Sequence, residues 1–202
     1  MSLRKLAIFS SVLLLVACGG TTPVRVDTGN DTAGTVMGLD YRDFEDAAAN
    51  MVASMLSSGA VSKPDGGRYV LAISRVTNDT MQRLDTDQLV KKMRVELLRS
   101  GKVVVTTAVS GNGAEDAMSY QARELRGNDE FDQDRVAGKG QMVAPDYSLS
   151  GKIIQRNNRI DSRNTQVDYY FQMTLTDIDT GLAYWEDEVP IIKRGSSKTV
   201  TW

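Results

Sequence analysis

The sequence predicts an α/β (α+β) domain built on a single mixed β-sheet, in which a parallel βαβ unit is followed by an antiparallel meander and flanked by helices. Two patterns predict this class. Between Arg68 and Thr106 a strand, an amphipathic helix and a β-branched strand follow one another in about 40 residues, the size of a βαβ unit. From Pro145 onward the apolar period changes to two, as in antiparallel strands.

The first expected element is a helix that begins after Asp40 and ends before Gly59. Asp40 is a suitable N-cap, because its side chain can accept hydrogen bonds from the free amides of the first turn. Apolar residues recur after it at helical spacing: Phe44, Ala48, Met51, Val52, Met55 and Leu56. Turn residues then occupy Lys63–Gly67.

The βαβ unit is expected to consist of a strand at 68–73, a helix and a second strand at 102–106. The first strand is an almost unbroken apolar run, which suits a strand buried on both faces. Asp85 and Gln88 have the spacing of a capping box, and the helix that they open carries one apolar stripe of Leu89, Val90, Met93 and Leu97. Gly101 ends the helix. The two strands should therefore be parallel, with a right-handed crossover.

The next segment, 111–138, is polar. Residues 114–126 are compatible with a helix and 128–134 read as an acidic loop. We expect both at the surface.

The meander should contain three strands. The first alternates over Tyr147–Ile154, a polar turn region covers 157–164, and the clearest strand of the chain follows. One face of that strand is apolar: Val167, Tyr169, Phe171, Met173 and Leu175. Asp177–Gly181 has turn composition and leads to a third strand from Leu182. Pro190 places the far half of this strand at an edge or bulge.

The N-terminus has the pattern of a secretory signal peptide at residues 1–17. The basic pair Arg4 and Lys5 precedes an apolar run of roughly a dozen residues, too short for the ~20 residues of a membrane-spanning helix. The run ends in Leu15, Val16, Ala17 and Cys18, which resembles the lipobox of bacterial lipoproteins and implies lipid attachment at Cys18. An ordinary signal peptide with an incidental cysteine is the alternative.

The remaining chain divides into three parts by composition. Residues 18–39 comprise the lipidated cysteine and a tether of small polar residues, 40–195 the globular domain, and 196–202 a loosely held tail. The 21 residues from Gly19 to Leu39 would span about 70 Å when fully stretched.

Composition excludes several kinds of site. The chain has no histidine, so Ser-His-Asp and Cys-His catalysis and imidazole metal sites are impossible. Its single cysteine cannot form an internal disulfide. With 24 Lys+Arg against 26 Asp+Glu, the charge balance argues against nucleic-acid binding. We expect no catalytic residues, metal, cofactor or small-molecule substrate.

Three short motifs have more ordinary interpretations. The D-T-G of aspartic proteases occurs at 27–29 and 179–181, but the first copy lies in the tether and the second in a turn that needs Asp and Gly. Ser196–Thr199 lacks the glycine and the strand-turn-helix context of a phosphate loop. The acidic run 128–134 lacks the glycine and distal glutamate of an EF-hand.

Arg156, Arg159 and Arg163 are the candidate partner-binding residues, together with Tyr170. The arginines lie in and around the turn between the first two meander strands, either as a solvated hairpin tip or as a protrusion suited to an acidic partner surface. Tyr170 lies on the polar face of the clearest strand, where it could anchor a partner or pack beneath a helix.

The order and spacing of several segments resemble the LpoB-type penicillin-binding-protein activators. These segments are Ile73–Thr80, Leu97–Lys102, Leu149–Ile153, Tyr169–Asp177 and Thr180–Trp185. The resemblance covers 40–195 and the lipobox. It implies the fold of the TolB N-terminal domain and attachment to the periplasmic face of the outer membrane, with which Gly19 after the cysteine is consistent.

The resemblance also implies a non-catalytic function. Members of this family contact an accessory domain of a bifunctional class A penicillin-binding protein and stimulate its glycan polymerisation and peptide cross-linking. The best-known members have a long proline-rich tether, whereas this tether is short and has one proline, Pro23.

Two other functions remain as alternatives. One is a structural or assembly lipoprotein of the envelope or of a secretion system, since a TolB-like fold also occurs there and a short tether suits work near the outer membrane. The other is an envelope hydrolase built on carboxylates.

Overall fold

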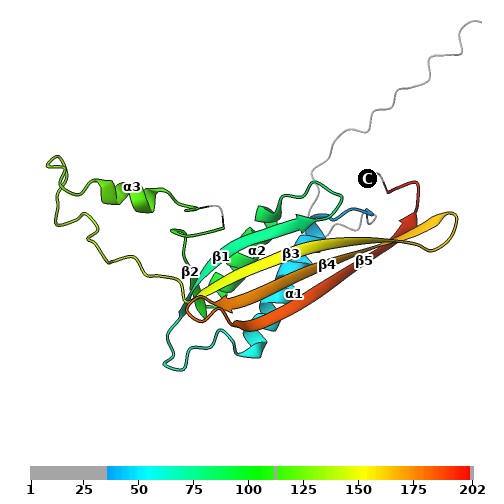
Figure 1. Cartoon of the computed structure of the whole chain (residues 1–202), viewed down its shortest axis with the longest axis horizontal. Coiled ribbons are helices and arrows are strands. Elements are labelled where there is room, and N and C mark those ends of the chain that lie inside the picture. The colour runs from blue at the N-terminus through cyan, green and yellow to red at the C-terminus, as the bar shows by residue number, and fades with distance from the viewer. Residues whose placement is uncertain (1–35, 112, 201–202) are drawn as a thin grey trace, which may run out of the picture. The chain divides into compact units, whose positions relative to one another are not determined.

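The computed structural model describes residues 36–111 and 113–200. These residues form a five-stranded mixed sheet with the strand order β2-β1-β3-β4-β5 (Figure 1). In chain order the elements are α1 (Tyr41–Ser58), β1 (Tyr69–Asp79), α2 (Thr86–Arg99), β2 (Val103–Val105), α3 (Met118–Glu124), β3 (Tyr147–Arg159), β4 (Asn164–Asp177) and β5 (Ala183–Ser196). β1 is parallel to β2 and β3, and the remaining pairs are antiparallel. The predicted fold class is confirmed.

Helix α1 begins where the sequence predicts. The Asp40 side chain accepts hydrogen bonds from Arg42 N at 2.9 Å and Asp43 N at 3.4 Å, and Asp43 Oδ2 accepts from Asp40 N at 2.7 Å. This reciprocal pair is a capping box, which satisfies amides that have no partner within the helix. The helix ends at Gly59, whose positive φ of 78° suits glycine.

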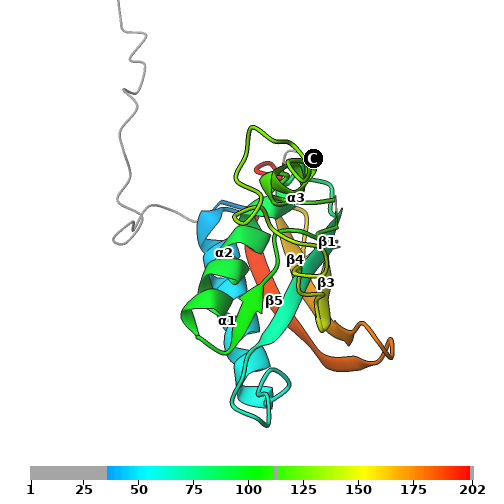
Figure 2. The same cartoon turned by 90° about the vertical axis from the view of Figure 1, so that its left-hand side faces the viewer.

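Helices α1 and α2 lie against the same face of the sheet. Figure 2 shows both helices on one side of the strands. The helices pack against each other, and of the strands α1 packs against β5 while α2 packs against β1 and β2. The predicted apolar face of β4 points toward these helices, and all five of its side chains are buried: Val167, Tyr169, Phe171, Met173 and Leu175. The core therefore lies between one face of the sheet and the two helices.

One glycine makes close packing between β3 and β4 possible. A Cβ atom at Gly151 would lie 2.1 Å from Met173 Sδ and 2.6 Å from the backbone oxygen of Gln172. Only a residue without a side chain fits this position.

Strands β3 and β4 are longer than the sequence predicts. Their pairing continues to Arg159↔Thr165, so half of the turn region expected at 157–164 is strand. Backbone hydrogen bonding extends the hairpin beyond the core, where side-chain alternation no longer reports burial. By contrast, the helix expected within 114–126 is shorter: α3 is seven residues long, and none of them is buried. Figure 1 shows α3 away from the sheet.

Residues that the sequence places in the tether and in the tail make contacts with the domain. Met37, expected in the tether, is 8% exposed and belongs to the core, and its carbonyl oxygen accepts a hydrogen bond from Tyr169 Oη at 3.0 Å. Leu39 N donates to Gln82 Oε1 at 3.1 Å. At the other end, Ser197 N donates to the Arg163 carbonyl oxygen at 2.8 Å, which ties the expected tail to the hairpin.

The predicted signal peptide, Cys18 and most of the tether lie outside the described residues. Among the helices that the structure describes, none has the length and apolar character needed to cross a membrane.

Candidate functional site

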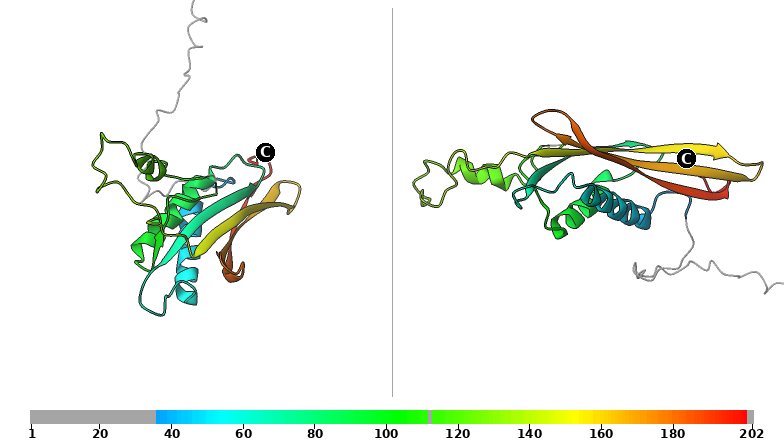
Figure 3. Two further views of the ribbon diagram at one scale, coloured as in Figure 1. Left: turned by 60° about the vertical axis from the view of Figure 1, so that its left-hand side comes forward. Right: turned by 90° about the horizontal axis from the view of Figure 1, so that it is seen from below.

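The face of β3, β4 and β5 that points away from α1 and α2 is the candidate site. We call its outward-facing residues the outer sheet face. Within residues 36–111 and 113–200 no helix packs on it, as the view from below in Figure 3 shows. Strand register arranges its side chains in rows across the three strands: Ile154–Tyr170–Pro190, Arg156–Asp168–Ile192 and Asn158–Gln166–Arg194.

The centre of the outer sheet face is apolar. Ile154 and Tyr170 are half-buried and Pro190 is exposed, although all three lie side by side in one row. Ile192 in the next row is 55% exposed. Because no described helix covers Tyr170, the interpretation that it packs beneath a helix does not hold for these residues. Its side chain is partly exposed, and its role as a partner anchor stays a prediction.

A polar network borders this apolar centre. Asp168 is 5% exposed, and its carboxylate accepts hydrogen bonds from Asn158 Nδ2 at 2.6 Å and Gln166 Nε2 at 2.7 Å. Gln166 Oε1 in turn accepts from Arg194 Nε at 2.6 Å. The network satisfies the buried carboxylate and fixes side chains on three strands, so this part of the surface is preorganised.

The three predicted arginines lie at two positions along the β3–β4 hairpin. Arg156 is exposed on the outer sheet face, where it lies opposite Asp168 and diagonal to Tyr170. Arg159 is the last residue of β3, and Arg163 lies in the turn beyond it. The structure therefore brings Arg156 and Tyr170 together, with Arg159 and Arg163 at the hairpin tip. Their role in binding stays a prediction.

The hairpin tip has a fixed backbone. Asp161 Oδ1 accepts hydrogen bonds from Arg163 N at 2.7 Å and Asn164 N at 2.8 Å, and its Oδ2 accepts from Asn164 Nδ2 at 2.9 Å. The hydrogen bond from the Asn164 side chain, together with those from the two amides, lowers the pKa of Asp161. Arg159 Nε donates to the Asp161 carbonyl oxygen at 3.0 Å.

Sequence reasoning missed Ile154, Pro190, Ile192 and Arg194 as members of this surface. The far half of the third meander strand, past Pro190, lies in the edge strand β5 as predicted, but the alternation of its side chains was a usable signal for this surface that the prediction did not include. Val189 and Ile191 are half-buried and Lys193 is buried, all facing the helices, so the residues between them must face outward.

Of the two D-T-G triplets, the copy at 27–29 lies outside the described residues and the copy at 179–181 lies in a turn. Asp177, at the turn that contains the second D-T-G triplet, accepts hydrogen bonds from Thr180 N at 2.8 Å and Thr180 Oγ1 at 2.7 Å. The Thr180 hydroxyl and amide lower the pKa of Asp177, as expected for a turn carboxylate. In the part of the chain that the structure describes, no group of His, Cys, Asp or Glu could hold a metal ion.

Comparison with known proteins decides the family. The model of the peptidoglycan-synthase activator LpoB matches residues 43–191. The chain belongs to the LpoB family. This confirms the resemblance found in the sequence, and members of the LpoB family have a regulatory role in peptidoglycan synthesis. No curated protein sequence matches the chain.

Solved structures of LpoB proteins are similar to this chain. The C-terminal domain of LpoB from Salmonella enterica is 17% identical, with coverage of 74% of this chain and 98% of that chain and a TM-score of 0.46. The corresponding domain from Escherichia coli is 18% identical, with the same coverage and a TM-score of 0.44. The NMR structure of Escherichia coli LpoB is 18% identical, with coverage of 89% and 82% and a TM-score of 0.41.

Proposed function

We propose that this LpoB-family protein binds the accessory domain of a bifunctional class A penicillin-binding protein and stimulates its glycan polymerisation and cross-linking. The observation that carries the proposal is the outer sheet face, which has an exposed apolar centre, a preorganised polar border and cationic residues at one end. Protein interfaces share this anatomy, with aromatic and arginine residues as frequent anchors.

The mechanism is a shift in the synthase's conformational equilibrium. A bound activator favours the active conformation only if its affinity for that conformation is higher. The activator thus needs no catalytic group of its own. Its contribution is a rigid surface, which the strand pairing and the Asp168 network supply.

We further propose that the protein is lipid-anchored through Cys18 at the periplasmic face of the outer membrane. The lipobox pattern supports this location. Cys18→Ser should move the protein from the outer-membrane fraction to the soluble fraction of lysed cells. Retention of the variant in the outer membrane would show that another contact holds it.

Binding measurements test the surface assignment. The intact protein in detergent micelles is titrated with the isolated accessory domain of a class A penicillin-binding protein by calorimetry. Reversal of charge at Arg156, Arg159 and Arg163 to Glu should weaken binding at least tenfold, because it places like charges against an acidic partner.

A matched control reverses three exposed arginines elsewhere: Arg68, Arg83 and Arg135. It changes net charge equally and should bind as the wild type does. Tyr170→Phe should also bind normally, whereas Tyr170→Ala should bind about 30-fold more weakly if the ring is an anchor. Equal losses in the two triple variants would show an unspecific charge effect and discard the surface assignment.

A further inference from the structure

The far half of β1 is an open strand edge. β2 has three residues against eleven in β1, and their pairing ends at Leu71↔Val105. One more backbone hydrogen bond follows on this side, from Gly111 N to the Ile73 carbonyl oxygen at 3.2 Å. Beyond it, no described segment pairs with this side of β1 up to Asp79, whereas β3 pairs with the other side.

The backbone N–H and C=O groups at this edge point to the side of β1 on which β2 lies farther back along the strand. Leu71 and Ile73 face the core, and their carbonyl oxygens accept hydrogen bonds on the β2 side. After the irregularity between Ile73 and Val76, Val76 again faces the core and is 4% exposed. In a strand, residues that share a face direct their N–H and C=O groups to the same side. The backbone groups of Val76 and Asn78 are therefore directed to the open edge.

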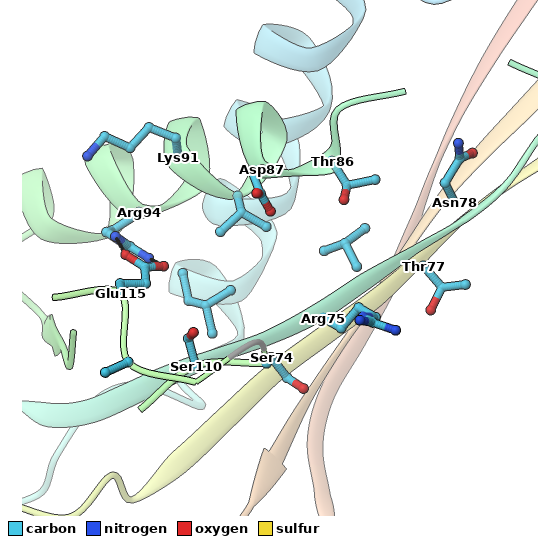
Figure 4. Close-up of a pocket in the computed structure, with 15 residues that line it drawn as sticks. Ser74, Arg75, Thr77, Asn78, Thr86, Asp87, Lys91, Arg94, Ser110 and Glu115 are labelled. Atoms are coloured by element: carbon cyan, nitrogen blue, oxygen red, sulfur yellow. Dashed lines mark hydrogen bonds and ion pairs between the residues drawn. The ribbon is translucent and has the colours of Figure 1, made fainter. Parts of the chain in front are cut away.

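A groove of about 670 Å³ runs along this edge (Figure 4). β1 forms one side, α2 contributes Val90, Lys91 and Arg94 to the other, and the loop with Gly111 and Glu115 closes one end. The loop passes close to β1 at Gly111. A Cβ atom at this position would lie 2.5 Å from Arg75 N. The groove occupies the place of a longer β2, and its volume is typical of ligand sites.

The charges in the groove favour an acidic occupant. Lys91 is exposed and has no hydrogen bond or ion pair among the described residues, and Arg75 is exposed at the β1 side. Of the two carboxylates in the groove, Glu115 is already ion-paired with Arg94. The other is Asp87. An acidic side chain entering the groove would thus meet a cation that needs a partner.

The opposite edge of the sheet is protected against strand pairing. β5 carries Pro190 near its middle and the inward-pointing charged residue Lys193, both of which discourage a further strand. The open part of β1 has no such residue facing its edge, and it is recessed between α2 and a loop. A recess of this kind admits one extended chain but excludes the edge of another sheet.

We propose that the Val76–Asp79 edge of β1 binds an extended acidic peptide segment of a partner protein by β-strand addition. Main-chain hydrogen bonds to Val76 and Asn78 supply affinity, and the apolar wall of Val76 and Val90 together with Lys91 supplies specificity. This site lies on a different strand edge from the outer sheet face, and it does not depend on the function proposed for that face.

Synthetic peptides test the proposal on the intact protein in detergent micelles. The probe is the fluorescein-labelled heptapeptide Thr-Val-Glu-Val-Glu-Val-Thr, compared by fluorescence anisotropy with its counterpart in which lysine replaces glutamate. The glutamate peptide should bind at least tenfold more tightly. Lys91→Glu should reverse this order, whereas Lys102→Glu, an exposed reversal outside the groove, should leave it unchanged.

Alternate N-methylation separates strand addition from simple charge attraction. Successive amides of an extended peptide point to opposite sides, so methylation of either the valine or the glutamate amides should abolish binding while the other set leaves it within threefold. Slower amide exchange of Val76 and Asn78 should accompany binding. Absence of binding at millimolar peptide, equal binding of both charge forms, or equal binding of both methylated forms overturns the proposal.

Discussion

Lys193 is a buried charge whose removal should destabilise the fold strongly. It is 6% exposed on the inner face of β5, where Nζ donates to Asp43 Oδ2 at 2.5 Å and to the Gly38 carbonyl oxygen at 2.7 Å. It thereby joins the first turn of α1 to the strand that carries Ile192 and Arg194 on its opposite face. Lys193→Met keeps most of the side-chain length and removes the charge.

The expected loss follows from the carboxylate left behind. Asp43, whose side chain is 13% exposed, would lose its cation while it remained buried. Breaking a buried ion pair by removing one partner costs about 3–5 kcal/mol. Asp43 Oδ2 keeps the hydrogen bond from Asp40 N at 2.7 Å, so we expect the lower end, about 3 kcal/mol. For a domain of this size that lowers Tm by roughly 6–12 °C.

Urea unfolding followed by circular dichroism measures this loss. Wild type, Lys193→Met, Asp43→Asn and the double variant form a cycle, and the double variant should be more stable than Lys193→Met, because it leaves no buried charge unpaired. Lys102→Met, at an exposed position, is the control. A loss below about 1 kcal/mol for Lys193→Met, or additive effects in the cycle, would refute this reasoning.

Three further predictions concern stability in urea. Asp40→Ala should cost about 1 kcal/mol, because it removes the N-cap of α1; an unchanged midpoint would contradict this. Gly151→Ala should cost about 1–3 kcal/mol, since the backbone oxygen of Gln172 cannot move aside easily; a neutral effect would show that β4 does shift. Burial raises the pKa of Tyr169 from 10 to about 12. The contribution of its neutral hydroxyl to the free energy of unfolding is therefore fully present below pH 10 and is lost as the pH rises to 12. Tyr169→Phe should reduce the fall in the free energy of unfolding between pH 10 and pH 12. An unchanged fall would contradict the raised pKa.

Elements with local signals were predictable from the sequence. Asp40 and Gly59 bound α1 because capping and left-handed backbone depend on neighbouring residues alone. The alternation in β4 predicted its buried face residue by residue, since that strand has the core on one side only. The parallel pairing of β1 and β2 followed from their connection through α2.

Features that depend on distant residues were not predictable. Met37 is held by a hydrogen bond from Tyr169, more than a hundred residues away, so local composition made the segment resemble a tether. The outer sheet face required the register across three strands, which joins Ile154, Tyr170 and Pro190. The groove beside β1 exists because β2 ends early, and a run of three valines does not by itself show where pairing stops.

Stimulation of a class A penicillin-binding protein tests the central claim most directly. Glycan polymerisation by the purified synthase is measured with and without the intact protein, and with the variant carrying Glu at Arg156, Arg159 and Arg163. We predict that wild type increases the polymerisation rate, that the control reversed at Arg68, Arg83 and Arg135 does so equally, and that the first variant does not. No stimulation of, and no binding to, any class A synthase of the same organism would contradict the account.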